Sequence, residues 1–470
     1  MSNSSPQHSQ SSSEHTSPEH SQSSSEHTSS EHSQSSEGYT TPEEQNSIEE
    51  INSPKIIDEG DDDYEPGGFH PVYIGDVYNN RYKILNKIGY GVYSTVWVVE
   101  DLQSQTSGRR KFLALKILRA DCYGTEQPLF EREILKHLRN GDRNIRGYDH
   151  VTHLVDDFEH DGPNGRHVCL LFQLYGETFG SFGAWFENRR IATGLMRSIV
   201  LQLLCALDFA HANGVIHTDI QPNNIFVKFR DHSLIESVYL KEAPVPHQDR
   251  DEKQYKAIPS QPLRSCYFSD PENINDFEFA LGDWGVASWT DKHLSNRIQP
   301  VTLRAPEVLI GAPWDASTDV WNLGALLLEL YRSVCLFDGR GPPDWNYGVR
   351  HHLAEIEEYF GPFPKAFLER GNQEIVQEMF DEEGRIKGMP PNWVWAPIDS
   401  ACPDLTQDRR EAFLVFLRSM LKVDPTERPS PRELAFAPWV GILQPKDDNP
   451  QSAERQGNAC WLVSLPPWGG

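Results

Sequence analysis

The chain has 470 residues, of which 38% are apolar and 11% aromatic, an ordinary content for a globular protein with room for two lobes or domains. Its formal net charge of −26 argues against nonspecific binding to nucleic-acid phosphates and favours basic partners, although solubility alone explains an acidic balance equally well. No apolar run reaches the roughly 18 residues that span a bilayer, and the first residues lack a secretory pattern, so we expect a soluble, intracellular protein.

Residues 1–63 are acidic and rich in Ser and His, and they contain a polar repeat. QSSSEHTSPEHS at 10–21 recurs almost unchanged as QSSSEHTSSEHS at 22–33. Such a segment has no apolar side chains to offset its ordering entropy, so we predict a disordered tail that offers Ser-Pro and Thr-Pro steps for phosphorylation. Its dispersed histidines are not expected to form a metal site.

A β-rich small lobe is expected over residues 64–175. Strand patterns run from Tyr82 to Val99, from Phe112 to Leu118 and over 167–174, and Glu126 to Leu138 is predicted to be a helix with Glu131 facing the sheet.

Helical patterns dominate residues 176–443, which predicts a larger helical lobe. Residues 195–212 place an apolar face along one helix, and 318–331 is apolar enough to be buried on all sides. Two inserts, 229–277 and 338–405, interrupt this lobe, and a polar tail at 444–470 ends in CWLVSLPPW. The IPSQPL portion of the first insert is expected to pack on a lobe.

The seven cysteines are scattered, and they form neither CxxC pairs nor Cys/His clusters at zinc spacing. We therefore expect reduced thiols, several of them in apolar core segments.

Glycines between two strand patterns suggest a phosphate-covering hairpin. Gly89 and Gly91 allow close approach of the backbone to a ligand, whereas Ser94 stands where such loops have a third glycine. Farther on, Lys116 lies inside an apolar strand, where its charge needs a partner, and Glu131 on the following helix is the candidate. A lysine that reaches solvent from a strand end is the alternative.

The segment His217-Thr-Asp219 is followed by Asn224, which places a carboxylate and an amide on one short loop. This spacing suits orientation of a hydroxyl and ligation of a metal ion, although a lone His-x-Asp is weak evidence. Asp283-Trp284-Gly285 supplies a second carboxylate after an apolar strand.

Three further residues are predicted to be structural. Glu307, in Arg-Ala-Pro-Glu, is expected to be buried and paired with Arg428, because a buried carboxylate without a partner is costly. Asp319 begins the apolar helix, where the helix dipole alone explains a carboxylate; the order of the motifs, which resembles that of protein kinases, would instead make Asp319 the anchor of the loop backbone around Asp219.

In this order the motifs resemble the eukaryotic protein kinase superfamily over about residues 80–440. The string YEPGGFHPVYIGDVYNNRYKILNKIGYGVYSTVW and the HTDI loop resemble the SR-protein kinase family. The resemblance implies an α+β, bilobal kinase fold, ATP with Mg²⁺, and phosphorylation of serine in basic Arg/Ser-rich proteins such as splicing factors. It also implies a monomer of the cytoplasm and nucleus without direct nucleic-acid or membrane binding.

The resemblance assigns roles to individual residues. Asp219 would orient the accepting hydroxyl, Lys116 would contact ATP while paired with Glu131, and Asn224 and Asp283 would bind the metal. The remaining nucleotide contacts would come from Ile88, Gly89, Gly91, Ser94, Val96, Ala114, Phe172 and Leu174, with residues 172–175 as the hinge.

Several positions depart from the family. Gln221 occupies a catalytic position, because the family has lysine there, and loss of a phosphate-clamping cation costs on the order of 10-fold to 1000-fold in rate. Pro300 stands where many kinases have a threonine that contacts the catalytic loop, with Thr302 nearby. Thr218 replaces an arginine that reads activation-loop phosphate, which predicts activity without such phosphorylation.

Residues 350–361 resemble the family's docking region. Glu358 keeps an acidic position there, whereas Arg350 and His351 replace expected acids.

Two other functions compete with an active protein kinase. Gln221, Pro300 and the irregular glycine loop favour a nucleotide-binding pseudokinase that acts as a scaffold. A small-molecule phosphotransferase would share the loop chemistry but has no need for Glu307, Asp319 and Arg428.

Overall fold

The computed structural model describes residues 58–104, 110–123, 129–251, 254–264, 266–268, 277–341, 345–389, 398, 402 and 405–441. The predictions for most of the N-terminal tail and for the C-terminal CWLVSLPPW segment lie outside these residues. Six of the cysteines are described, and all six are free thiols.

The N-lobe is built on an antiparallel sheet with the strand order β1-β2-β3-β4-β6-β5. Its strands are β1 (Val77–Tyr78), β2 (Tyr82–Gly91), β3 (Ser94–Asp101), β4 (Phe112–Leu118), β5 (Leu154–Gly162) and β6 (Gly165–Gln173). The stretch predicted as one β-rich run, 82–99, is a hairpin whose turn lies between Gly91 and Ser94. Strand β4 lies between β3 and β6, and apolar clusters bury its residues on both faces: Leu115 and Ile117 belong to one cluster, Phe112 and Ala114 to the other.

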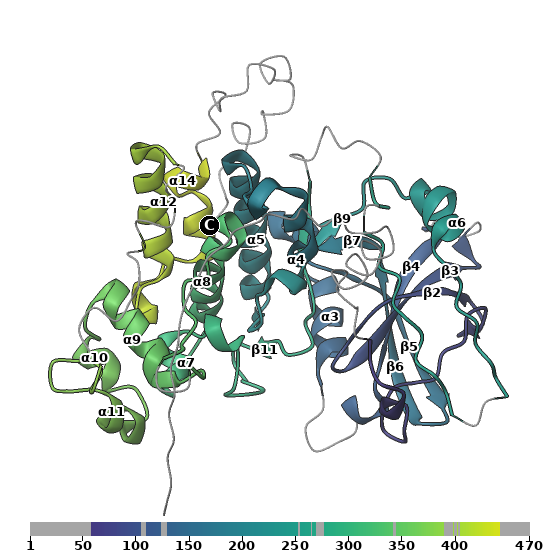
Figure 1. Cartoon of the computed structure of the whole chain (residues 1–470), viewed down its shortest axis with the longest axis horizontal. Helices are drawn as coiled ribbons and strands as arrows, with labels where there is room; N and C mark the ends of the chain where they lie inside the picture. Colours follow the sequence, from purple (N-terminus) through teal and green to yellow (C-terminus); the bar gives the residue numbers. More distant parts are fainter. Residues whose placement is uncertain are drawn as a thin grey trace, which may run out of the picture. The chain divides into compact units, whose positions relative to one another are not determined.

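Helix α3 (Glu131–Arg139) packs against this sheet beside β5 (Figure 1). It begins later than predicted, with Phe130 at its N-cap, and the predicted residues 126–128 lie outside the described part.

The C-lobe is mainly helical, as expected, and short strands join it to the sheet side (Figure 1). Its helices are α4 (Phe179–Phe182), α5 (Thr193–Ala212), α7 (Pro306–Leu309), α8 (Ser317–Arg332), α9 (Val349–Phe360), α10 (Lys365–Leu368), α11 (Gln373–Met379), α12 (Gln407–Met420), α13 (Pro431–Ala435) and α14 (Pro438–Gly441). Helix α6 (Leu240–Glu242), in the first insert, lies beside the N-lobe sheet instead (Figure 1). The strands are β7 (Tyr175–Thr178), β8 (Val215–Ile216), β9 (Ile225–Lys228), β10 (Phe279–Leu281) and β11 (Ser288–Trp289).

Helices α5 and α8 form the centre of this lobe, which confirms both predicted helices. Among the described residues, α5 is the one helix long and apolar enough to cross a membrane, but 67% of its most apolar window is buried inside the lobe. It packs against α8, α13, α14 and β10, so we interpret it as a core helix.

The first insert packs on the N-lobe rather than projecting as a surface loop. Ile258 joins the core on the outer face of the sheet, and Leu263 joins the cluster on the opposite face, which confirms the expectation for IPSQPL. Ile235 and Tyr239 are buried in that second cluster as well.

Residues 58–63, assigned above to the acidic tail, also contact the N-lobe. Asp58 accepts hydrogen bonds from the backbone and hydroxyl of Ser260, and Glu59 is buried against Lys87. The ordered lobe therefore begins before Tyr64.

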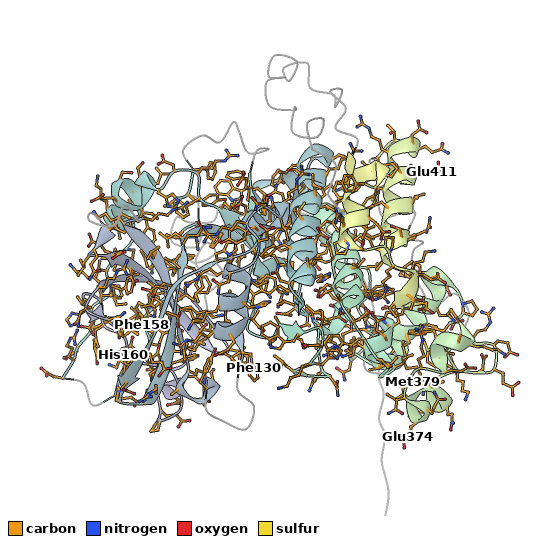
Figure 2. The ribbon with its side chains drawn as sticks, turned by 180° about the vertical axis from the view of Figure 1, so that it is seen from behind. Phe130, Phe158, His160, Glu374, Met379 and Glu411 are labelled. Carbon is orange, nitrogen blue, oxygen red and sulfur yellow. The ribbon has the colours of Figure 1, made fainter. Side chains whose placement is uncertain are left out.

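Figure 2 views the molecule from behind and labels Phe158 and His160 on β5 and Glu374 and Met379 on α11 of the second insert.

Candidate active site

Lys116 links the sheet, α3 and the Asp283 segment. Its Nζ lies 2.7 Å from Glu131 Oε1 and 2.9 Å from Asp283 Oδ1. Burial works to lower the pKa of Lys116, but the carboxylates of Asp283 and Glu131 outweigh it and raise that pKa. The Lys116 ammonium in turn lowers the pKa of Asp283. The predicted pair is thus formed, and the alternative of a lysine reaching solvent is excluded.

Asp319, in the first turn of α8, holds the backbone of the loop around Asp219. Asp319 accepts hydrogen bonds from the backbone N–H groups of His217 at 2.8 Å and Thr218 at 2.9 Å, and His211 Nε2 lies 2.8 Å away. Burial alone would raise the pKa of Asp319, but the hydrogen bonds from His211 and His217 lower it. The predicted anchoring role of Asp319 is confirmed, and the Thr218 backbone is held at a left-handed φ of 65°.

Asp219 receives side-chain hydrogen bonds from two neutral amides of its loop. Gln221 Nε2 donates to Asp219 Oδ2 at 2.8 Å, and Asn224 Nδ2 donates to the same oxygen at 2.7 Å. Burial raises the pKa of Asp219, which makes its carboxylate a better proton acceptor, while these donors act in the opposite direction. Gln221 therefore supports the carboxylate without adding a positive charge.

The two carboxylate segments face one site. His217 Nε2 contacts the carbonyl of Gly282 at 2.9 Å, its ring meets Trp284 edge-on, and the Gly282 N–H donates to the carbonyl of Asn224 at 2.8 Å. Asp283 adds to the raised pKa of Asp219, as expected for carboxylates close enough to repel each other.

The expected nucleotide contacts gather under the glycine hairpin. Ala114 and Leu174 are buried in one apolar cluster, and Ile88, Val96 and Phe172 pack against it. In the hairpin, Gly89 pairs with Val96 and Gly91 pairs with Ser94, and a Cβ added at Gly89 would meet nothing within 4 Å. The hairpin is therefore open to a ligand on its glycine side.

The residues present fit a nucleotide with a divalent cation. Asn224 uses its Nδ2 to hold Asp219, which leaves its amide oxygen as an acceptor, and the Asp283 side chain is 47% exposed. Two such oxygen donors suit a hard cation that keeps its other ligands from phosphate and water.

A cavity of about 570 Å³ lies on the N-lobe, and a larger one of about 1300 Å³ lies beside Asp219. The wall of the larger cavity includes Tyr93 of the hairpin, Phe130 before α3, and Asp219, Gln221 and Pro300. The space is large enough for a polypeptide side chain to reach Asp219.

Gln299 was missed by the sequence analysis. Its N–H donates to the carbonyl of Thr218 at 2.8 Å, and its side chain bridges the Thr318 carbonyl and the Ala305 N–H. Gln299 thus connects the activation segment, residues 283–307, to the loop around Asp219. Many kinases make this connection with a threonine at the position of Pro300. Its backbone has a left-handed φ of 67°, which the residue type glutamine does not indicate.

Glu307 and Arg428 form the predicted buried pair. Both side chains are fully buried, and each carboxylate oxygen of Glu307 lies 2.6 Å from a guanidinium nitrogen of Arg428. This bidentate contact ties the end of the activation segment to the C-lobe.

In residues 350–361, which resemble the docking region, an ion pair offsets the positive charge of Arg350. Arg350 Nη2 lies 3.3 Å from Glu378 on α11, so its charge is paired rather than free, and Glu358 is exposed on α9.

Known proteins share this architecture. The model of the protein kinase domain family matches residues 82–241 and 269–440. The chain is 33% identical to a serine/threonine protein kinase of Aspergillus fumigatus, covering 82% of this chain and 91% of that protein. It is 27% identical to protein kinase dsk1 of Schizosaccharomyces pombe (83% and 86% covered) and 23% identical to SRSF protein kinase 3 of Mus musculus (80% and 89%).

A solved structure, the kinase domain of PF14_0431, matches with a TM-score of 0.55 at 21% identity and covers 79% of this chain and 98% of that chain. That likeness supports the bilobal fold. With the family match, the curated relatives and the geometry of Lys116, Asp219 and Asp283, the chain belongs to the protein kinase family and is a serine/threonine protein kinase that resembles the SR-protein kinases.

Proposed function

We propose that this kinase transfers the γ-phosphate of ATP, bound with Mg²⁺, to serine in basic, Arg/Ser-rich proteins. The observation that carries the proposal is the shared site of Lys116, Asp283 and Asp219, in which the first two are paired and the third faces a large open cavity. The bound cation would neutralise phosphate charge, and Asn224 and Asp283 would hold it.

Each protein group has a defined task in this proposal. Lys116, fixed by Glu131, holds the nucleotide phosphates, and the glycine hairpin covers them. Asp219, with its pKa raised by burial, orients the serine hydroxyl and accepts its proton. Catalysis rests on positioning and charge neutralisation, so no covalent enzyme intermediate is needed.

The negative charge of the chain and the name of one relative support a basic acceptor protein. The chain carries a net charge of −26, and exposed acids such as Glu358 on α9 and Glu374 on α11 (Figure 2) lie in the second insert. One relative is named for SRSF proteins. We further propose that the protein works as a monomer in the cytoplasm and nucleus.

A direct experiment compares acceptors. Radiolabelled ATP should label an Arg/Ser peptide far faster than a peptide of the same length with Lys in place of Arg, because guanidinium groups make bidentate contacts with carboxylates. Raising the salt concentration should raise the KM for the Arg/Ser peptide, since exposed charges are screened. Equal labelling of both peptides would contradict the proposed substrate class.

The alternative is a scaffold that binds nucleotide without transfer, and Gln221 is the observation that favours it. A thermal shift with Mg-ATP but no labelling of any peptide would select that alternative. Against it, the structure keeps Lys116, Asp219, Asn224 and Asp283 in one connected site, for which a scaffold has no chemical need.

A further inference from the structure

The strand that leads into the glycine hairpin contains a buried ammonium group. Lys87 is fully buried, and its Nζ lies 2.5 Å from both carboxylate oxygens of Glu59 and 2.9 Å from the carbonyl of Ile258. Asp58 Oδ1 is 3.5 Å away. A buried charge is tolerated only with such partners, so this contact is specific.

Three segments meet at this point of β2. Glu59 comes from the N-terminal segment, Ile258 from the first insert and Lys87 from the sheet. The insert also binds the strand backbone, because the N–H of Gln261 donates to the carbonyl of Lys87 at 2.8 Å. Asp58 joins the two outer segments by accepting the hydroxyl of Ser260 at 2.6 Å.

The geometry of β2 relates this contact to the nucleotide site. The pairing of β2 with β3 shifts register between Ile84 and Asn86 and again between Lys87 and Gly89. Such bulges change the direction of side chains. Here Ile88 packs against the apolar cluster that contains Ala114 and Leu174. Lys87 instead contacts Glu59 and Ile258, and Ile258 belongs to the core on the other face of the sheet. Gly89, the first glycine of the hairpin, lies two residues after Lys87 in the sequence.

We propose that Glu59 and Lys87 are positioning residues for ATP: the ion pair fixes the root of the glycine hairpin and so sets how the hairpin covers the phosphates. This proposal rests on the proposed ATP-dependent transfer. A hairpin backbone that shifts at its root misplaces every phosphate contact above it, so loss of the pair should weaken nucleotide binding more than peptide binding.

The test compares Glu59→Gln with wild type in the full chain, using Glu65→Gln as a matched control, since Glu65 is an exposed acid of the same segment. We expect Glu59→Gln to raise the KM for ATP by about 10-fold, with the KM for an Arg/Ser peptide changed by less than about 2-fold. Amide hydrogen exchange in residues 88–96 should also speed up. Glu59→Asp, which keeps the charge, should recover part of the ATP affinity.

A purely structural role predicts a different result. In that case Glu59→Gln would lower the melting temperature but leave the KM for ATP within about 2-fold of wild type, and the proposal would be overturned. If Glu59→Gln does not fold, Ser260→Ala removes the hydroxyl contact to Asp58 and keeps the backbone one, so it should raise the KM for ATP by a smaller factor; no change would also overturn the proposal. If the wild type binds Mg-ATP without transfer, the proposed function fails, and the same comparison is made with the dissociation constant for Mg-ATP.

Discussion

Gln221 Nε2 lies 2.8 Å from Asp219 Oδ2, so a neutral amide contacts the proposed catalytic carboxylate at the position where SR-protein kinases carry lysine. The hydrogen bond keeps the carboxylate oriented. It does not supply positive charge to the transferring phosphate, so the loop is intact in shape and reduced in charge.

Restoring the cation should therefore increase turnover. We expect Gln221→Lys to raise kcat by about 10-fold or more, the lower end of what loss of a phosphate-clamping group costs. Steady-state transfer to an Arg/Ser peptide measures this. Asn223→Lys, which adds the same charge at an exposed position of the same loop, serves as the control and should have little effect. Equal gains in both variants would point to general electrostatics instead.

Activity should not depend on phosphorylation of the activation segment. Thr218 is buried, and its hydroxyl donates to the carbonyl of Val286 at 2.8 Å, so this position offers no cation to a phosphate. Treatment with a phosphatase should leave kcat unchanged. A stoichiometric phosphate between Asp283 and Glu307, found by mass spectrometry and needed for activity, would show that this account of Thr218 is wrong.

The buried pair of Glu307 and Arg428 should be important for stability. Arg428→Ala leaves a buried carboxylate without its partner and should cost about 3–5 kcal/mol of unfolding free energy. Chemical denaturation measures the loss. Arg428→Met combined with Glu307→Leu removes both charges and should be less destabilised than Arg428→Ala; additive losses would argue against a coupled pair.

Glu355 on α9 should make stability depend on pH. Burial raises the pKa of Glu355 from 4.5 to about 8, against the opposing N–H of Gly339. Because the folded pKa lies above the unfolded one, the contribution of Glu355 is fully present below about pH 4.5 and is lost as the pH rises through about 8. Melting temperatures measured across this window should fall less for Glu355→Gln than for wild type. Parallel curves for the two proteins would refute the assignment.

The sequence was sufficient for contacts that follow from the order of motifs. Lys116 with Glu131 and Glu307 with Arg428 were predicted because a buried charge requires a partner. Asp319 with the loop around Asp219 was predicted because the order of the motifs resembles that of kinases. The two central helices were predicted because their apolar patterns are long.

Contacts without a local pattern could not be predicted. Glu59 lies in the acidic run DEGDDD, which has the composition of a disordered tail, and nothing near it in sequence indicates Lys87. Gln299 acts through its backbone as much as through its side chain, so its residue type gives no signal. The start of α3 was misplaced, because Leu129 and Phe130 fell inside the predicted helix whereas Phe130 is the N-cap of the helix in the structure.

The central claim is that Asp219 acts on a serine hydroxyl beside a nucleotide held by Lys116 and Asp283. Transfer from radiolabelled ATP to an Arg/Ser peptide should occur with wild type and fall by about 100-fold or more in Asp219→Asn, while Mg-ATP still raises the melting temperature of the variant. Transfer by Asp219→Asn at the wild-type rate, or no transfer by wild type despite Mg-ATP binding, would contradict it.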